Sequence, residues 1–289
     1  MFDLVLSVLC SSLIFVIFKL FAVYKIETFY AIITNYVVAC TMGLLLYRGS
    51  VEVVQIPNKA WFWGSFALGL LFIIVFNLMA ATSQRLGVSV ASVATKMSLV
   101  LPVLFGVYSY QEVLGPITVM GILMALAAVY FASVKERTAI FKLSALLLPF
   151  LVFLGSGFID ISLAYFQKEF VAPKEVPIFS ATIFASAAVI GLGYISIKSL
   201  KQPLKINLKN CIAGIALGVP NYFSIYFLLR ALQNKALSSA AIFTINNVAI
   251  VMFSTLLGIL LFKEKLSPKN WFGIALAVIS ILLVARSNG

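Results

Sequence analysis

Residues 111–122 read QEVLGPITVMGI, and residues 263–274 read KEKLSPKNWFGI. Both segments contain a polar Glu-x-Leu-x-Pro pattern followed by Gly-Ile, so that the identical pairs are Glu112/Glu264, Leu114/Leu266, Pro116/Pro268, Gly121/Gly273 and Ile122/Ile274. Isolated matches arise easily between apolar helices, but a shared polar turn is harder to obtain by chance. The two segments therefore predict an internal repeat.

The repeat extends upstream of both turns. Residues 84–95, QRLGVSVASVAT, align with residues 233–244, QNKALSSAAIFT, and the tripeptide Ala-Leu-Gly at 67–69 aligns with the same tripeptide at 216–218. We place the boundary of the two copies between residues 138 and 139, which gives a first repeat of residues 1–138 and a second of residues 139–289.

The composition predicts an integral membrane protein. Of 289 residues, 63% are hydrophobic and 10% are charged, and the mean hydropathy is +1.11. A bilayer core of about 30 Å needs about 20 apolar residues in a helix, and runs of that length recur between short polar breaks. We predict an all-α fold of about ten transmembrane helices, near residues 2–23, 28–47, 60–83, 88–110, 114–132, 143–166, 176–197, 209–232, 237–262 and 269–286.

Each copy of the repeat therefore holds five predicted spans. Because five is odd, the second copy enters the membrane in the opposite sense from the first. Such an inverted repeat is the construction of many carriers, which expose one central site alternately to each side. A passive scaffold built by gene duplication is the alternative to a carrier.

The charged and reactive residues exclude several function classes. The chain has 21 Lys and Arg against 9 Asp and Glu, a net charge of +12, but these bases stand mostly between apolar runs, where they contact lipid headgroups rather than nucleic acid. Histidine is absent, and the three cysteines lie apart in apolar stretches. We therefore expect no metal, no cofactor and no enzymatic activity.

Lys96 and Asp160 are the two charges predicted to lie inside spans. A charge in the bilayer costs about 2.5 to 3.5 kcal/mol on insertion scales, so it faces the protein interior or water. We predict that Lys96 binds a substrate carboxylate or phosphate, and that Asp160 is its resting partner, a proton-coupling group or a site for an amine. The alternative is a permanent structural pair, or side chains that reach the interface.

Neutral polar side chains lie in neighbouring predicted spans. We predict substrate contacts at Asn77, Thr95, Tyr222, Asn246 and Asn247, with hydrogen bonding between helices as the alternative. Gly214-x-x-x-Gly218 and its counterpart Ser65-x-x-x-Gly69 are typical of close helix packing. The two glutamates of the repeated turns, Glu112 and Glu264, are expected to cap or orient the following helix rather than touch solute.

These motifs resemble the EamA-type carriers of the drug/metabolite transporter superfamily. In that family the fourth helix of each repeat begins with small residues, often carries a proline and ends in a Glu-x-Leu turn. Here the first copy has Ala91-Ser92, Pro102 and Glu112-Val113-Leu114, while the second has Ala240-Ala241, Val251 in place of the proline, and Glu264-Lys265-Leu266. The resemblance implies a ten-helix carrier with a central cavity and both termini inside.

The charge pattern predicts the opposite orientation. Lys and Arg are concentrated in the breaks after the first, third, fifth, seventh and ninth spans. The positive-inside rule places these breaks in the cytoplasm and both termini outside. We give the charge pattern slightly more weight than the resemblance.

The resulting functional prediction is a secondary transporter, an exporter of an amino acid or another zwitterion or anion, in the bacterial cytoplasmic membrane. No Walker A loop is present, so coupling uses an ion gradient or is absent, and proton coupling through Asp160 is predicted. A flippase of lipid or lipid-linked sugar with the same fold is the first alternative. An intramembrane enzyme is the second, and a channel is disfavoured because no polar rings recur along the spans.

Overall fold

The structure of the chain is a computed structural model, which describes residues 2–47, 53–110, 115–133, 143–172, 175–200, 207–232 and 239–287. In these ranges the chain forms α-helices and one 3₁₀ helix, with no strand. The elements are α1 (Phe2–Val23), α2 (Thr28–Leu46), η1 (Val53–Asn58), α3 (Phe62–Arg85), α4 (Val88–Met97), α5 (Val100–Tyr110), α6 (Pro116–Ser133), α7 (Leu143–Glu169), α8 (Val176–Ser199), α9 (Leu208–Leu232), α10 (Ser239–Phe262) and α11 (Pro268–Ser287).

The described helices confirm an all-α membrane protein. Seven of them contain segments long and apolar enough to cross a membrane, and the ranges Val88–Pro102, Val119–Ala132 and Pro268–Leu283 are shorter apolar helices. Helices α4 and α5 together occupy the predicted span 88–110, and every other predicted span corresponds to one helix. The repeated turn of the first copy at 111–114 and the boundary at 138/139 lie outside the described residues.

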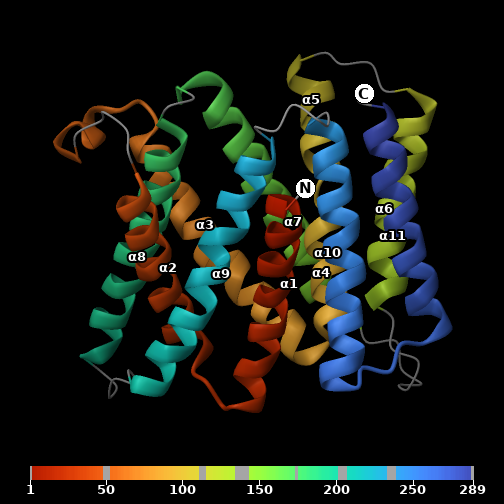
Figure 1. Cartoon of the computed structure of the whole chain (residues 1–289), viewed down its shortest axis with the longest axis horizontal. Helices are drawn as coiled ribbons and strands as arrows, with labels where there is room; N and C mark the ends of the chain where they lie inside the picture. Colours follow the sequence, from red (N-terminus) through yellow and green to blue (C-terminus); the bar gives the residue numbers. More distant parts are fainter. Residues whose placement is uncertain are drawn as a thin grey trace.

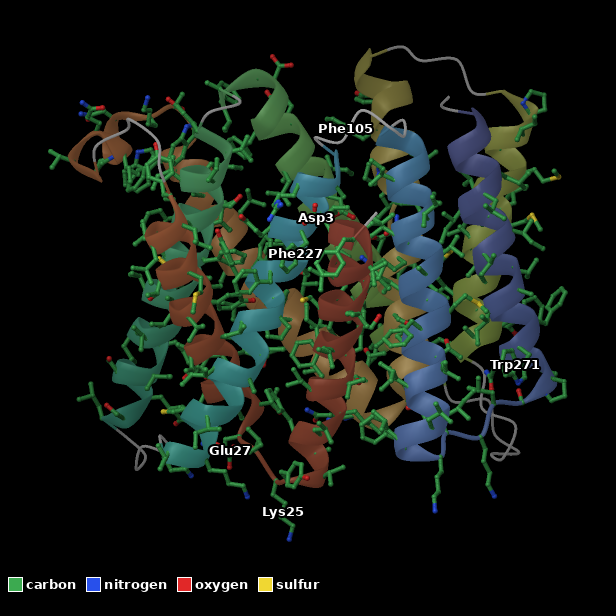
Figure 2. The ribbon with its side chains drawn as sticks, viewed as in Figure 1. Asp3, Lys25, Glu27, Phe105, Phe227 and Trp271 are labelled. Atoms are coloured by element: carbon green, nitrogen blue, oxygen red, sulfur yellow. The ribbon has the colours of Figure 1, made fainter. Side chains whose placement is uncertain are left out.

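The helices stand side by side and consecutive spans run in alternating directions (Figure 1). Helices α2 and α8 lie at one end of the long axis, α6 and α11 lie at the other, and α1 lies between them. We call the face that carries Lys25 and Glu27 the lower side, and the opposite face, toward which Asp3 points, the upper side (Figure 2).

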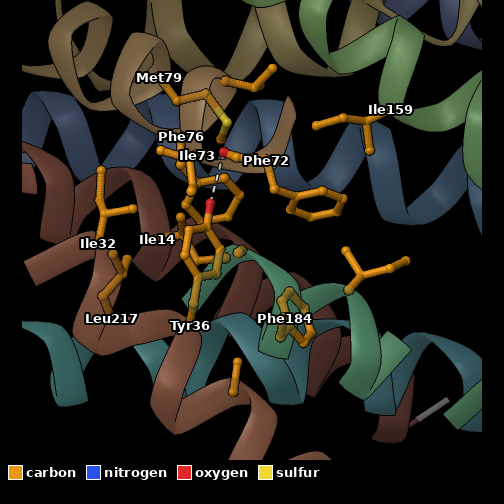
Figure 3. Close-up of a cluster of buried hydrophobic side chains, with 14 of the residues drawn as sticks. Ile14, Ile32, Tyr36, Phe72, Ile73, Phe76, Met79, Ile159, Phe184 and Leu217 are labelled. Carbon is orange, nitrogen blue, oxygen red and sulfur yellow. Dashed lines mark hydrogen bonds between the residues drawn. The ribbon is translucent and has the colours of Figure 1, made fainter. Parts of the chain in front are cut away.

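An aromatic cluster fills the space between α1, α2, α3 and α8 (Figure 3). Tyr36 is completely buried and donates its hydroxyl to the carbonyl of Phe72 at 2.7 Å. Its ring stacks on Phe184 with centroids 6.2 Å apart and lies 5.5 Å from the ring of Phe76. Because lipid is as apolar as these rings, close packing rather than exclusion from water holds the helices together here.

Small residues let neighbouring helices approach closely, as the sequence predicted. A Cβ on Gly214 of α9 would meet Thr34 and lie 2.6 Å from the carbonyl oxygen of Ala31, both on α2. In the counterpart motif, a Cβ on Gly69 of α3 would lie 2.7 Å from the backbone nitrogen of Ala187 on α8. The predicted packing role of both motifs is therefore confirmed.

Helices α6 and α11 form a seam at the other end of the molecule. Ser280 donates to the carbonyl of Gly121 at 2.7 Å, and Asn270 donates to the carbonyl of Ala132 at 2.9 Å. A Cβ on Gly273 would collide with the backbone of Ala132. The last helix of each predicted repeat thus packs on its counterpart with backbone-close contacts.

Candidate functional site

The fourth predicted span is broken near its middle. Helix α4 ends at Met97 and α5 begins at Val100, with a turn at Ser98 and Leu99. Pro102 favours the break, because it has no N–H for the carbonyl of Ser98 and its ring would clash with that carbonyl, although Pro149 and Pro220 lie within α7 and α9 without ending them. The Ser98 carbonyl instead accepts a hydrogen bond from the backbone N–H of Leu101 at 2.9 Å. In α10, where Val251 replaces proline, the helix runs without interruption.

Lys96, Ser98 and Asp160 come together at this break. The hydroxyl of Ser98 lies 3.1 Å from Oδ2 of Asp160 and 2.6 Å from the carbonyl oxygen of Thr95. Lys96 and Asp160 are close enough to interact electrostatically. Within the described ranges, however, the two side chains form no ion pair shorter than 4 Å. The predicted pair of charges is therefore a shared polar group rather than a closed salt bridge.

Asp160 is exposed although it lies on the inner face of α7. Ser156 and Phe153, one and two turns earlier on the same face, are buried. Phe158 and Tyr165, which are among the exposed apolar side chains of α7, lie on other sides of the helix. Since Asp160 contacts Ser98, its carboxylate lies where α7 faces α4, and the residue keeps exposed surface there.

Helix α10 presents Asn247 toward the same interior. Asn247 is half-buried and shares its face with buried Val251 and Ser254, across the helix from exposed Ile245 and Met252. Helix α10 packs against α4. The neighbouring Asn246 is buried, and its side-chain oxygen has no hydrogen-bond partner within the described part of the chain.

Helix α1 carries the hydroxyl of Ser11 on an inner face, and the sequence pattern did not predict it. Ser11 is half-buried on the face that also carries Ser7 and Phe18, both completely buried, while Leu9 and Leu13 on the opposite face are exposed. Serine is common in apolar helices, so the sequence alone gave no signal for it. Only the packing of α1 against α3, α9 and α10 identifies its face as an inner one.

The other predicted site residues have separate surroundings. Thr95 adjoins Lys96 and donates its hydroxyl to the carbonyl of Ala91 at 2.9 Å. Asn77 donates to the carbonyl of Ile73 in its own helix at 2.7 Å and lies on the face of exposed Leu70. Tyr222 stacks on Tyr226 with centroids 6.1 Å apart. The structure therefore brings Thr95, Lys96 and Asp160 together and places Asn77 and Tyr222 in different contacts.

Glu264 forms a contact between distant parts of the sequence. Its carboxylate accepts hydrogen bonds from the backbone N–H of Val88 at 2.7 Å and from the hydroxyl of Ser89 at 3.1 Å. Glu264 was expected to cap the helix that follows it. In the structure it caps α4, which lies in the other predicted repeat.

On the upper side, an ion pair and a hydrogen bond to Glu175 connect α3 with α8. Lys59 lies 2.6 Å from Oε1 of Glu175, and the indole N–H of Trp61 donates to Oε2 at 3.1 Å. The hydrogen bond from Lys59, followed by that from Trp61, lowers the pKa of Glu175 below its ordinary value. These contacts connect the start of α3 with the start of α8.

Among the described side chains, no group of three or more Cys, Asp or Glu is placed to hold a metal ion. Cys10, Cys40 and Cys211 are half-buried free thiols. The site can therefore offer a cation, a carboxylate, hydroxyls and amides to a small polar molecule.

Comparisons with known proteins give a family match and two similarities over the whole chain. The model of the EamA-like transporter family matches residues 143–286. A protein of Haemophilus influenzae, named only as an uncharacterized protein, is 28% identical to this chain, with 97% of this chain and 96% of its own length covered. A solved crystal structure, described simply as that of a protein, has a TM-score of 0.61 and 18% identity over 99% of this chain and 96% of its own. This last similarity concerns the fold alone.

Proposed function

We propose that this chain, a membrane protein of the EamA-like transporter family, carries a small metabolite across the membrane by alternating access. The proposed substrate is an amino acid or another zwitterion or anion, and the proposed direction is export, which rests on the family resemblance alone. One observation carries the proposal. Lys96 lies two residues before Ser98, at the break between α4 and α5, and the hydroxyl of Ser98 lies 3.1 Å from the carboxylate of Asp160 on the inner face of α7.

The chemistry of this group supports a zwitterionic substrate. A zwitterion carries a carboxylate, which an ammonium group such as that of Lys96 attracts, and an amine, which a carboxylate such as that of Asp160 attracts. Broken helices at membrane depth are typical substrate sites in transporters, because the freed backbone groups and nearby side chains line a cavity. Asn247 and Ser11 are proposed as neutral contacts around the same site.

The contacts between helices support an inverted repeat of residues 1–138 and 139–289. In such a repeat, α1, α2, α3 and α6 of the first copy correspond, in that order, to α7, α8, α9 and α11 of the second. The α1–α9 contact then corresponds to the α7–α3 contact, and the α2–α9 contact corresponds to the α8–α3 contact. All four contacts are present, and the α2–α8 and α6–α11 contacts map onto themselves. Two antiparallel copies around one site provide the two access states of a carrier.

We place the protein in the bacterial cytoplasmic membrane. The relative in Haemophilus influenzae covers nearly the whole chain. Proteins of the bacterial outer membrane are typically β-barrels, whereas the described spans of this chain are helical.

The test is a thermal-shift screen of the purified protein with a panel of neutral amino acids, monocarboxylates and simple amines. A ligand that binds the folded form at about 100 times its Kd stabilises it by about 2.7 kcal/mol. We expect amino acids to raise the melting temperature of the wild type and of Lys265→Gln, a control in an exposed loop. Lys96→Gln should lose this response, and flux of the selected compound into liposomes should follow the same pattern.

An equal melting response in Lys96→Gln and the wild type would remove Lys96 from the site. Stabilisation by lipid-linked compounds, with none by the panel, would favour a flippase instead.

A further inference from the structure

The N-terminus of α4 depends on a side chain from the second half of the chain. The first backbone N–H groups of a helix have no partner within the helix, and a carboxylate there also interacts favourably with the helix dipole. For α4, Glu264 fills this role through Val88 and Ser89. The N-cap position itself is Gly87, which has no side chain to supply a hydrogen bond.

The backbone around this carboxylate is shaped to receive it. A Cβ on Gly87 would lie 2.9 Å from Oε1, and a Cβ on Gly258 would lie 2.6 Å from Oε2. Gly87 has a φ of +122°, a conformation that L side chains rarely adopt. Lys263 takes a left-handed φ of 52°, and the N–H of Glu264 donates to the carbonyl of Gly258 at 3.2 Å. This turn ends α10 and directs Glu264 back toward α4.

Helix α4 is short and carries the proposed site at its other end. It has ten residues, with Lys96 in its last turn and the Pro102-dependent break immediately after it. Isolated helices of this length are marginal, so their position depends on what holds their ends. Ser92, between the Glu264 contact and Lys96, is completely buried.

We infer that Glu264 is a positioning residue that fixes α4 from the opposite half of the chain. Through α4 it holds Lys96 in the site. Any movement of the α4 N-terminus away from the end of α10 then requires the Glu264 carboxylate to leave it. The part of this inference that concerns Lys96 rests on the proposed function, whereas the anchoring of α4 does not.

The experiment measures how fast a membrane-impermeant thiol reagent modifies Ser92→Cys. Cys10, Cys40 and Cys211 are first replaced by Ser, and the full-length protein is placed in liposomes in both orientations. In the otherwise unchanged protein, modification is slow because position 92 is buried. Glu264→Leu keeps the approximate size of the side chain and removes its acceptors. We expect a rate roughly tenfold higher or more, the factor expected when a charge-assisted hydrogen bond to a helix end is lost.

Two further variants distinguish the hydrogen bonds of the Glu264 carboxylate from the size of its side chain. Glu264→Gln keeps one carbonyl acceptor and should return the rate toward that of the wild type. Gly258→Ala keeps the carboxylate but displaces it, so the rate should rise as in Glu264→Leu. The matched controls are Gly193→Ala, where an added Cβ meets nothing within 4 Å, and Lys265→Leu in the same loop as Glu264. Both controls should stay within about twofold of the wild type.

An unchanged rate in Glu264→Leu, or an equal rise in Lys265→Leu, would overturn the inference. Failure of the proposed function has a different signature. In that case Lys96→Gln would leave the melting response to the amino acids unchanged, while Glu264→Leu would still raise the labelling rate at position 92.

Discussion

Asp160 faces inward and accepts a hydrogen bond from a neutral donor. Ser98 supplies the hydrogen bond, and Lys96 is the charged group that acts on the carboxylate. A carboxylate on the inward-facing side of a membrane helix is a typical proton-coupling group. Replacement of Asp160 by asparagine, whose side chain has nearly the same shape, therefore distinguishes a role in proton coupling from a role in packing.

We predict that Asp160→Asn abolishes the dependence of flux on a pH gradient, because the amide keeps an acceptor for Ser98 but cannot exchange a proton. The measurement is liposome flux of the amino acid selected by the thermal-shift panel, with and without a gradient. Glu169→Gln, at the exposed end of α7, is the control and should keep the dependence. Persistence of the dependence in Asp160→Asn would remove this role.

The contacts of the Glu175 carboxylate predict that the stability of the folded protein depends on pH. Because Lys59 and Trp61 lower its pKa, the carboxylate stabilises the folded protein above its ordinary pKa, and this contribution is lost as the pH falls through the lowered value. Glu175→Gln should therefore melt several degrees below the wild type at neutral pH, and the difference should shrink in acid. Melting curves between about pH 3 and pH 7 test this. A difference that is constant with pH would contradict it.

The residues of the candidate site were predictable to different degrees. Lys96 and Asp160 stand out in sequence because charges inside apolar spans are rare. Asn247 and Ser11 have inner faces that only the packed helices define. The role of Glu264 as a helix cap followed from its position, but its partner did not. The helix that follows it in sequence is α11, whereas the helix whose N-terminus it caps is α4.

At the scale of elements, the ends and directions of the helices followed from runs of apolar residues between polar turns. The division of the fourth span into α4 and α5 did not. Hydropathy is continuous across residues 88–110, so the pattern predicted one helix. The break lies where Pro102 cannot donate a hydrogen bond to the Ser98 carbonyl, and it places the hydroxyl of Ser98 against Asp160.

The contact between α9 and α2 predicts which glycine tolerates a methyl group. Gly214→Ala would press its Cβ against Thr34 and the carbonyl of Ala31. Overpacking of this kind costs about 1 to 3 kcal/mol, so the melting temperature should fall by several degrees. Gly193→Ala, in open space on α8, should leave it unchanged. Equal melting temperatures for the two variants would show that α9 and α2 lie further apart.

At the scale of the whole molecule, the basic residues make the two sides different. The helix ends and turns of the lower side, in the part of the chain that the structure describes, include Lys25, Arg85, Lys198, Lys209, Lys263, Lys265 and Lys269. The positive-inside rule places this side in the cytoplasm. We predict that Tyr24→Cys, next to Lys25, is protected from an impermeant thiol reagent in intact cells, whereas Val54→Cys in η1 reacts. Both positions are exposed. The reverse pattern would give the orientation that the family resemblance implies.

Helices from the two halves pack against each other toward both ends of the long axis (Figure 1). These contacts are between α6 and α11 at one end, and between α2 and both α8 and α9 at the other. In the proposed alternating access, these two contacts keep the halves joined, and the line between them is the axis about which the halves would turn. In a rotation each point moves in proportion to its distance from the axis, so the upper and lower ends of the helices between the two contacts would move most. The depth at which α4 is broken, where Lys96 and Asp160 lie, would move least, so that one binding site could stay in place while access changes from one side to the other.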